Sequence, residues 1–223
     1  MKNESNNNHP TVSELRRERE RAEMTERILS EAREMFVREG YEAVTLRKIA
    51  NAIEYSPATI YQYFKDKQDL VLAIIRADYL DLRNTLLKCQ AINDPLARVI
   101  EMARSYADWG ISHPNHYRLL LAPPPAWTPK RQDLWQQDKP LLEQDALFLL
   151  NLVVEQGIRA GMLKEKYTDS KLIAATLWAG LHGVIMLEIT AQDMGKSMIH
   201  AAQSSFEKRF NMMLEAFRDG FLR

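Results

Sequence analysis

The sequence predicts an all-α protein, and three observations carry that prediction. Glycine accounts for only 8 of the 223 residues, and the composition leans towards residues that favour helix. Apolar residues recur at every third or fourth position through most of the chain. Capping residues and prolines divide this pattern into about nine segments of helical length. We therefore expect a three-helix N-terminal domain joined to a larger helical domain.

The composition is that of a soluble globular protein. Hydrophobic residues make up 46% and charged residues 27%, and the formal net charge is zero, so the whole chain has no electrostatic footprint for nucleic acid. The longest apolar runs, such as residues 147–154, are far shorter than the roughly 20 residues of a membrane span. The polar N-terminus lacks the pattern of a signal peptide, and the single cysteine excludes an intramolecular disulfide. These features predict a cytoplasmic protein.

Residues 45–64 predict two short helices joined by a tight turn. Thr45 is a good N-cap, and a helix that starts there turns Arg47 and Lys48 outward. Its inward positions, at i, i+3, i+4 and i+7, are Leu46, Ile49, Ala50 and Ile53. This first helix therefore has one apolar face and one polar face.

The second helix begins at Ser56 and Pro57, an N-cap followed by a residue preset for the first helical position. Ile60 and Phe64, one turn apart, point inward. The outward strip is small at its start and polar at its end, and consists of Ala58, Thr59, Gln62 and Tyr63. Two such helices form a helix-turn-helix, which lays its second helix in the major groove of DNA.

The same residues resemble the TetR family of bacterial transcriptional regulators. The family pattern reads Thr-x-Arg-x-Ile-Ala, a turn, Ser-x-x-Thr-Leu/Ile-Tyr-x-x-Phe and then Lys. The matching residues are Thr45, Arg47, Ile49, Ala50, Ser56, Thr59, Ile60, Tyr61, Phe64 and Lys67. One position departs from it, since Glu54 stands where the family usually has glycine. Either the turn avoids positive φ, or Glu54 adopts it at a cost of about 1 kcal/mol.

The resemblance implies a set of DNA-contacting residues. They are Thr45, Arg47, Ser56, Pro57, Ala58, Thr59, Tyr61, Gln62, Tyr63 and Lys67. We expect Thr45 and Tyr63 at phosphates, and Arg47 at a phosphate or a guanine edge. Pro57, Ala58, Thr59 and Gln62 are expected at bases. Lys67 follows the cap residue Asp66, where a positive charge opposes the helix dipole; a bound phosphate explains this, and a solvated lysine is the alternative.

The segment before residue 22 is expected to be a tail, disordered or extended. Residues 1–12 have almost nothing to bury. The arginines of residues 16–21 have two interpretations, an arm that reaches a phosphate or the minor groove, and a solvated helical extension. A first helix is predicted from Met24 to Gly40, with Tyr41 packing back on Phe36. It completes a DNA-binding domain over residues 22–82.

Residues 83–223 are predicted to form the second domain. One helix follows Asp66, another runs from Asp94 to Gly110, and a short one starts at Pro114. Residues 123–129 are proline-rich and predict a loop. Helical periodicity resumes at about 134 or 140 and runs to 161. A helix after residue 168 or 169 is apolar on nearly every side, and the last covers about 200–221.

The second domain resembles the Trp-His-Gly type of TetR-family C-terminal domain. The resemblance rests on Trp178, His182, Gly183, the Leu187-Glu188 pair and the segment 113–121. It implies a ligand-binding and dimerisation domain whose last two helices pair with those of a second copy in a four-helix bundle. Small residues at four-residue steps, Ala175, Ala179 and Gly183, fit this, as does a phenylalanine stripe on the last helix. A core-only role for the stripe is the alternative.

A pocket for a small molecule is expected among aromatic residues of the second domain, because such sites are largely apolar with a few polar groups. The candidate lining residues are Tyr106, Trp109, Tyr117, Phe148, Trp178, His182 and Met186. The alternative is that these aromatic residues are plain core. Glu188, if buried, would favour a cationic or hydroxylated ligand.

No catalytic or metal-binding pattern is recognised. The histidines lack zinc spacing, no strand and Gly-Lys-Ser/Thr motif makes a nucleotide loop, and no Gly-x-Ser-x-Gly elbow occurs. Cys89 is interpreted as an inert thiol. We therefore expect no metal, no cofactor and no enzymatic activity.

These observations predict a homodimeric repressor that binds a palindromic DNA operator and is released by a small apolar or aromatic effector. Two other classes of protein are weighed against it. A helical enzyme would need convergent titratable groups in a pocket, and a protein-interaction module would use the same dimer helices without DNA.

Overall fold

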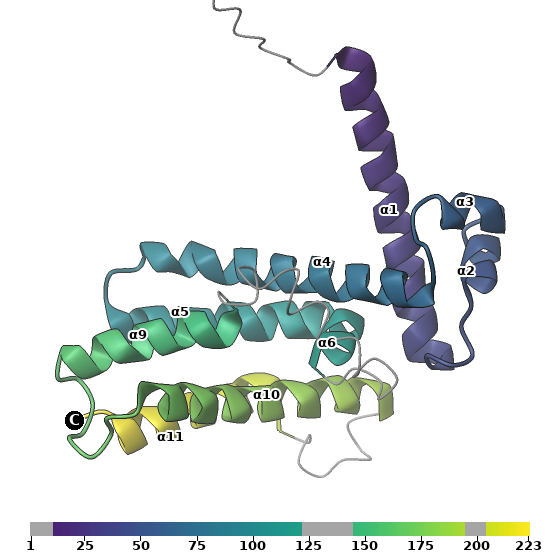
Figure 1. Cartoon of the computed structure of the whole chain (residues 1–223). Coiled ribbons are helices and arrows are strands. Elements are labelled where there is room, and N and C mark those ends of the chain that lie inside the picture. The colour runs from purple at the N-terminus through teal and green to yellow at the C-terminus, as the bar shows by residue number, and fades with distance from the viewer. Residues whose placement is uncertain (1–10, 122–144, 195–203) are drawn as a thin grey trace, which may run out of the picture. The chain divides into compact units, whose positions relative to one another are not determined.

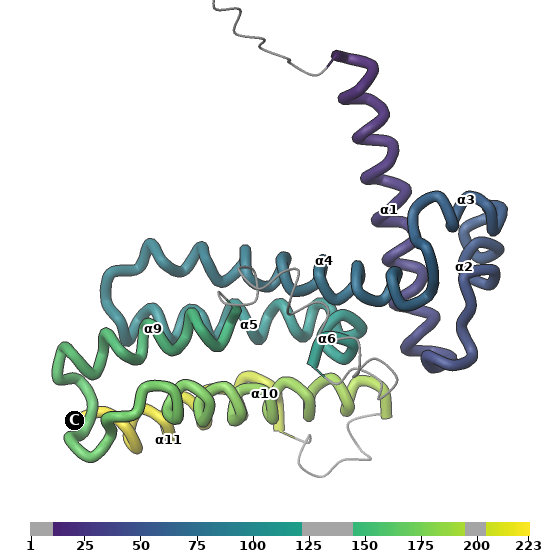
Figure 2. The backbone as a smooth tube through the Cα atoms, in the orientation of Figure 1, coloured from purple at the N-terminus to yellow at the C-terminus, as the bar shows by residue number. Residues whose placement is uncertain are grey.

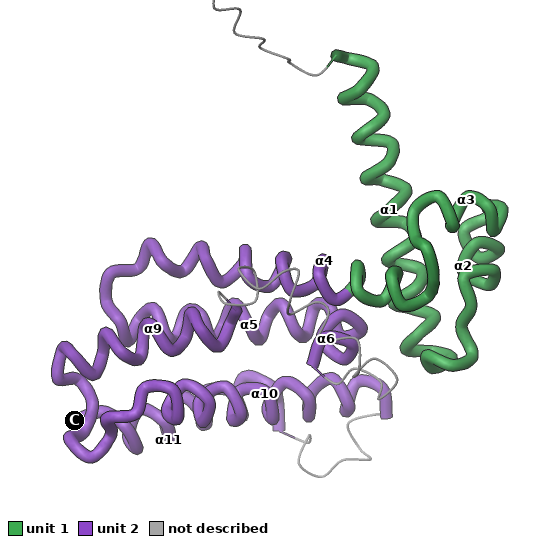
Figure 3. The backbone as a smooth tube through the Cα atoms, in the orientation of Figure 1, with its two compact units in different colours: residues 1–74 green, residues 75–223 purple. Residues whose placement is uncertain are grey.

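The computed structural model describes residues 11–121, 145–194 and 204–223, and these residues are all-α, as predicted. They form nine α-helices and one 3-10 helix. The chain divides into two compact units, residues 1–74 and 75–223, shown in Figure 3. The predicted proline-rich loop at 123–129, the helix start at 134 or 140 and the beginning of the last helix at 200 lie outside the described residues.

The first unit holds helices α1 (Val12–Glu39), α2 (Leu46–Ala52), α3 (Pro57–Tyr61) and the start of α4 (Lys67–Leu87). Figure 1 shows α2 and α3 beside the C-terminal half of α1. Its core takes fully buried side chains from each of the three helices, among them Ile28 and Ala32 of α1, Ile49 of α2 and Ile60 of α3. This is the predicted three-helix domain.

Helix α1 begins at Val12, well before the predicted start at Met24. Thr11 and Glu14 form a capping box, in which each side chain satisfies a backbone amide of the other residue. Arg16 and Glu20 then pair at i,i+4 over 2.8 Å. Local interactions thus make residues 12–21 helical although their side chains are exposed, and the helical extension replaces the expected tail.

The end of α1 agrees with the prediction. Gly40 has a φ of 80°, a value that glycine adopts without steric penalty, and its N–H donates to the carbonyl of Phe36. The ring of Tyr41 lies 5.7 Å from that of Phe36. The chain therefore leaves α1 on a short loop that leads to Thr45.

The second unit contains the remainder of α4, the 3-10 helix η1 (Lys88–Ala91) and five further helices. They are α5 (Pro95–Ser112), α6 (Pro114–Leu121), α9 (Ala146–Arg159), α10 (Ser170–Met194) and α11 (Phe206–Phe221). Helix α9 packs against α5 and α10, and α10 packs against α11, as the backbone trace in Figure 2 shows. The caps Asp94, Asp145 and Ser205 each accept a backbone N–H at a helix start.

Helix α5 continues past Gly110, which was predicted to end it. A Cβ at Gly110 would lie 2.7 Å from Cδ2 of Tyr117 and 3.1 Å from Cγ2 of Ile185. The side chain of Tyr117 is fully buried. The lack of a side chain at Gly110 therefore allows α6 and α10 to pack closely against α5, and the residue does not end the helix.

Helices α10 and α11 pack closely within one chain. A Cβ at Gly180 would lie 2.5 Å from Cζ of Phe217, and Phe210 is 1% exposed. Much of the phenylalanine stripe is thus used against the chain's own α10. Ala179 and Gly183 of the small-residue strip remain exposed.

Helix α10 is unusually apolar for its exposure. Within the described residues it is the one helix long and apolar enough to cross a membrane by length and composition, a test that core helices of soluble proteins also pass. Only 33% of its most apolar window is buried within the chain. The rest of that apolar surface is not buried by the chain itself, and an exposed apolar surface of this kind marks a site of interaction.

Cys89 is buried on η1, with its Sγ 3.6 Å from Oγ of Ser105. It is the single cysteine of the sequence. Its place inside the second unit agrees with an inert thiol.

Replacing Gly110 by alanine tests the packing of Tyr117. We expect the Gly110→Ala variant to lower the free energy of unfolding by about 1–3 kcal/mol, because an extra methyl group cannot fit against the buried ring. Urea denaturation measures it. Gly220→Ala is the control, since nothing lies within 4 Å of a Cβ at that position. Equal stability of the two variants would contradict the packing argument.

Candidate functional site

The first element of the site is α2, which presents Arg47. Oγ1 of Thr45 accepts the N–H of Lys48 over 3.2 Å and caps the helix as predicted. The inward residues Leu46, Ile49, Ala50 and Ile53 are all at most 5% exposed. Arg47 is exposed and has no hydrogen bond or ion pair among the described residues. Its guanidinium is therefore free for a partner.

The turn between α2 and α3 is made by Glu54 in the left-handed region, with a φ of 62°. The N–H of Tyr55 donates to the carbonyl of Ala50 over 2.9 Å, which closes the end of α2. Of the two alternatives left by the sequence, the chain adopts the strained one.

Helix α3 carries the predicted strip on its outer side. Oγ of Ser56 accepts the N–H of Thr59 over 3.2 Å, and Ile60 and Phe64 are buried. Ala58, Tyr61 and Gln62 are exposed, with Tyr61 at 59%. Pro57, Thr59 and Tyr63 are half-buried. Of the candidate base-contacting residues, Ala58 and Gln62 are thus exposed and Pro57 and Thr59 are half-buried, whereas the hydroxyl of Ser56 caps the helix.

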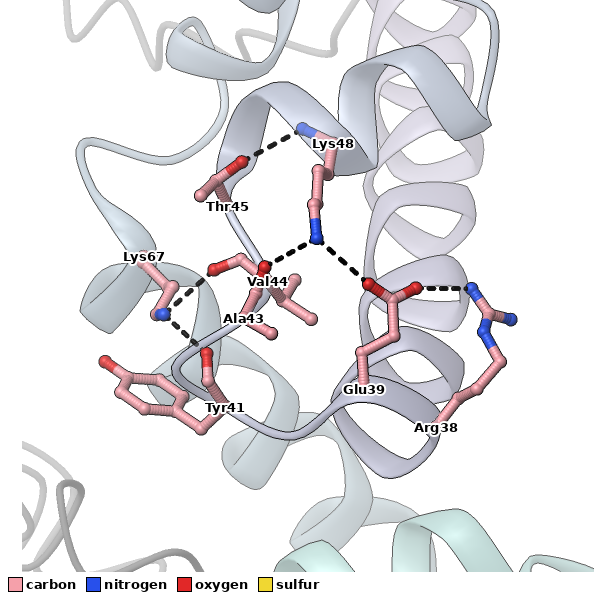
Figure 4. Close-up of polar contacts among 8 residues, drawn as sticks. All are labelled: Arg38, Glu39, Tyr41, Ala43, Val44, Thr45, Lys48 and Lys67. Atoms are coloured by element: carbon pink, nitrogen blue, oxygen red, sulfur yellow. Dashed lines mark hydrogen bonds and ion pairs between the residues drawn. The ribbon is translucent and has the colours of Figure 1, made fainter.

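Lys67 lies inside the first unit, in contrast to the expected phosphate anchor. Its ammonium donates to the carbonyls of Tyr41 (2.5 Å) and Val44 (2.9 Å), shown in Figure 4. It also lies 3.9 Å from the centroid of the Tyr41 ring. Burial lowers the pKa of Lys67. The lysine therefore holds the loop that leads into Thr45, which explains a cation at the start of α4.

Lys48 is likewise engaged with its own chain. Its Nζ donates to the carbonyl of Ala43 over 2.8 Å and to Oε2 of Glu39 over 3.2 Å (Figure 4). Hydrogen bonds from Arg38 and Lys48 lower the pKa of Glu39. The loop between α1 and α2 is thus tied on two sides, by Lys48 and by Lys67.

The arginine-rich start of α1 lies beside the recognition helix. The guanidinium of Arg21 lies 4.9 Å from the centroid of the Tyr63 ring. This contact places the helical extension next to a residue of the candidate interface.

The second unit brings four of the predicted pocket residues into one hydrogen-bonded chain. Trp178 donates its Nε1–H to the hydroxyl of Tyr106 over 3.0 Å, Tyr106 bonds Tyr117, and the Tyr117 hydroxyl lies 2.9 Å from Nδ1 of His182. Whether Tyr117 or His182 donates in the last of these hydrogen bonds depends on the tautomer of the imidazole.

The environment of these groups is apolar. Burial raises the pKa of Tyr106 and of Tyr117, and burial lowers the pKa of His182. The His182 ring is stacked on Tyr117 at 5.6 Å and on Trp178 at 5.2 Å between centroids. The imidazole is thus held neutral between two aromatic rings.

Of the other predicted pocket residues, Trp109 lies beside this group, with its ring centroid 6.5 Å from that of Tyr117. Trp109 is buried and donates Nε1–H to Asp81 over 2.7 Å. Met186 is half-buried. Phe148 is 41% exposed on α9, because the buried side of that helix is made by Leu149, Val153 and Val154. The helical spacing of α9 thus sets Phe148 outside the aromatic cluster.

Two cavities are lined by described residues of the second unit alone. The larger, of about 290 Å³, is lined by residues of α5, α9, α10 and α11 and by none of the seven predicted residues. The smaller, of about 50 Å³, is lined in part by Tyr106 and Trp178. The two share Val99, Leu177, Leu214 and Phe217.

Glu188 is buried, at 5% exposed, and forms an ion pair with Arg209 of α11. Its charge is therefore already compensated within the chain. The sequence-based idea that Glu188 selects a cationic or hydroxylated ligand is not supported by this arrangement.

Comparison with known families decides the identity of the chain. The profile of bacterial regulatory proteins of the tetR family matches residues 28–74. A second profile, the tetracyclin repressor-like C-terminal domain, matches residues 99–214 and by itself spans more than half of the 223 residues. The chain belongs to the TetR family.

Individual relatives match a short part of the chain. The regulator TcmR of Streptomyces glaucescens is 34% identical over 61 residues, which are 27% of this chain and 27% of that protein. The repressor AcnR of Corynebacterium diphtheriae is 39% identical over 51 residues, 23% of this chain and 27% of the relative. The match thus spans about a quarter of the length of these relatives.

Solved structures share the fold over most of the length of this chain. The TetR-family regulator PfmR of Thermus thermophilus has a TM-score of 0.66 at 18% identity and covers 88% of this chain and 99% of that one. The fatty acid degradation regulator FadR of Bacillus halodurans has a TM-score of 0.70 at 14% identity, covering 88% and 95%. At this identity the likeness concerns the fold alone. Together with the family match, it points to a regulator and not to an enzyme.

Some contacts of this TetR-family fold were missed from the sequence. The roles of Glu39, Lys48 and Lys67 depend on partners up to 26 residues away, which no local pattern reveals. The larger cavity takes its polar rim from α11, through Asn211, Glu215 and Arg218. The phenylalanine stripe on the same helix was the one available signal.

Replacing Glu54 by glycine tests the strain in the turn. We expect the Glu54→Gly variant to raise the free energy of unfolding by about 1 kcal/mol, because glycine adopts positive φ without a Cβ clash. Glu54→Ala removes the same charge but keeps a Cβ, so its stability should match wild type. A gain in both variants, measured by urea denaturation, would assign the effect to charge.

His182 gives stability a pH dependence. Its pKa in the folded chain lies below the ordinary value of 6.5, so the unfolded chain binds the proton more readily. The contribution is fully present above pH 6.5 and is lost as pH falls below it. Between pH 7 and pH 5 the free energy of unfolding should fall less than in wild type in His182→Asn, whose uncharged amide can donate or accept a hydrogen bond with Tyr117. Parallel denaturation curves for the two proteins would exclude this.

Proposed function

We propose that this chain is a DNA-binding transcriptional repressor that acts as a homodimer on a palindromic operator and is released by a small apolar molecule. The observation that carries the proposal is the exposed strip of α3. Ile60 and Phe64 anchor that helix from within, while Ala58, Tyr61 and Gln62 face solvent beside the unpaired Arg47. A polar strip on a capped, anchored helix is what a major groove accepts.

The relatives support the same activity. TcmR, AcnR and UidR of Escherichia coli are named as helix-turn-helix transcriptional regulators or repressors, and each matches between 51 and 61 residues of this chain. Regulators of this family act in the cytoplasm, where their DNA is, and the proposal places this chain there.

We assign contacts by the chemistry of each exposed group. Arg47 reaches a phosphate or a guanine edge, and Thr45 and Tyr63 meet phosphates. Pro57, Ala58, Thr59 and Gln62 meet bases. Lys67 acts indirectly, because its two bonds to backbone carbonyls hold the loop before Thr45.

The dimer is proposed on the uncovered surface of α10. Ala179 and Gly183 are exposed, Leu172 is 65% exposed, and most of the apolar window of this helix is not buried by its own chain. A second copy of α10 and α11 would cover this surface in a symmetric four-helix bundle. Sedimentation at the single-chain mass of 25.9 kDa would contradict it.

Release requires that the effector discriminates between two states. A dimer bound to a palindrome sets its two recognition helices about 34 Å apart, one turn of DNA. An effector that prefers a dimer with another spacing lowers DNA affinity by the ratio of its affinities for the two states.

The experiment is DNA binding by matched pairs of variants. DNA is first selected by the wild-type protein from a random-sequence pool, and binding is then followed by fluorescence anisotropy over a range of salt. Gln62→Ala should weaken binding to the selected DNA sequence by about 1–3 kcal/mol. It should also relax the sequence preference at the base pair that Gln62 contacts. Arg47→Ala should reduce affinity, and if its partner is a phosphate the salt slope should fall by about 1.

Two exposed residues of the second unit serve as controls. Gln90→Ala and Arg159→Ala remove the same groups from η1 and α9, and both should bind like wild type. The residue assignment fails if Gln62→Ala and Arg47→Ala keep both affinity and preference. The function itself fails if the wild type selects no sequence and does not bind, at low salt, the DNA upstream of its own gene.

A further inference from the structure

Polar contacts hold helix α11 at two places, near its start to α5 and near its end to the segment after α9. At one end Arg104 makes a two-pronged ion pair with Glu207, at 2.8 and 2.9 Å, and its guanidinium lies 4.0 Å from the centroid of the Phe210 ring. At the other end Lys164 donates to the carbonyls of Asp219 and Gly220, at 2.6 and 3.2 Å. The cavity of about 290 Å³ lies between these two contacts.

These contacts explain why the two helices do not collapse onto each other. The backbone N–H of Lys164 donates to Phe221, and that of Arg223 donates to Met162, so the end of α11 is fixed to the segment after α9. Because bonds between polar groups hold α11 to α5 near one end and to the segment after α9 near the other, the space between them depends on the placement of whole helices and not on one side chain.

The interior of this cavity offers almost nothing to a polar molecule. Its lining includes Val99 and Leu177 and the buried Val153 and Ile173, both 4% exposed. A water molecule needs two to four polar partners to be stable in such a space. An apolar occupant replaces that unfavourable water and gains free energy in proportion to the surface it buries.

The polar groups lie at the rim and come from one helix. Asn211, Glu215 and Arg218 of α11 are exposed, and Arg218 is paired with Asp219 over 3.0 Å. The rim thus offers an amide, a carboxylate and a guanidinium. Because charges of both signs are present, the rim favours an occupant with an uncharged hydrogen-bonding end group over an occupant with a net charge.

The volume sets the size of the occupant. An apolar cavity of about 150 Å³ accommodates benzene, with six non-hydrogen atoms. This cavity has a volume of about 290 Å³ and therefore has room for about twelve non-hydrogen atoms, twice as many as benzene has.

We infer that the space between α5 and α11 is a binding site for an apolar molecule of about twelve non-hydrogen atoms that carries one uncharged polar end group. Resting on the proposed function, this site is also that of the effector. The wall that it shares with the smaller cavity, including Leu177 and Phe217, connects it to Tyr106 and Trp178. An occupant therefore touches the same side chains that pack against the hydrogen-bonded aromatic chain.

The test is direct titration of the full-length protein with straight-chain alcohols, followed by calorimetry. Each methylene that is buried contributes about 0.8 kcal/mol, so affinity should rise about fourfold per carbon until the cavity is full. We expect 1-decanol to bind on the order of 100-fold more tightly than 1-hexanol. Equal affinity of the two alcohols, or no binding of 1-decanol, overturns the site.

A pair of variants locates the site. Ile100 lines the cavity and is 42% exposed, so Ile100→Trp narrows the space without burying a misfit in the core. It should weaken 1-decanol binding at least tenfold. Leu147→Trp makes the same kind of change on α9 at a residue that is 36% exposed and does not line the cavity, and it should bind like wild type. Leu222→Trp, at the other end, replaces Ile100→Trp if that variant melts early.

The outcomes separate this site from the proposed function. Undiminished 1-decanol binding by folded Ile100→Trp and Leu222→Trp overturns the site, whatever the DNA result. If 1-decanol binds as expected but no DNA is selected, the repressor proposal fails and the site stands. If both bind and saturating 1-decanol leaves DNA affinity unchanged, the role as effector site is overturned.

Discussion

The DNA-facing surface depends on the anchoring of two helices that are too short to be stable alone. Helix α2 has seven residues and α3 has five, below the length at which isolated helices form in water. Side-chain caps at Thr45 and Ser56 supply their first hydrogen bonds, and burial of Ile49 and Ile60 in the core of the first unit supplies the rest of their stability. Every exposed residue of α3 is therefore positioned by residues that never face a ligand.

The parts of this arrangement that local chemistry determines were predictable. Thr45, Ser56 and Asp94 act within three residues of themselves, and the inward positions of α2 follow from helical spacing alone. The early start of α1 had a local signal too, the capping box of Thr11 and Glu14, which was outweighed by the lack of apolar residues nearby. Helix caps that stand next to apolar helical periodicity were therefore predicted, whereas the cap of α1, which stands in a polar segment, was missed.

The interpretation of charged and aromatic residues was harder, because it depends on which distant groups they meet. Lys67 was expected at a phosphate, but it bonds carbonyls on a loop 23 and 26 residues earlier. The aromatic residues of α5, α6 and α10 do gather, yet they satisfy one another's hydrogen bonds, while the larger cavity forms where α5 and α11 are held apart. Such spaces are set by how whole helices are spaced, which a residue pattern does not encode.

The burial of Cys89 has a consequence for the assembled protein. With the one native thiol enclosed, a cysteine introduced at an exposed position would be the single accessible thiol of each chain. Two symmetric copies would then carry one label each, related by the dimer axis. With the labels at an exposed position of α3, the distance between them would report the distance between the two recognition helices. No native residue would have to be removed.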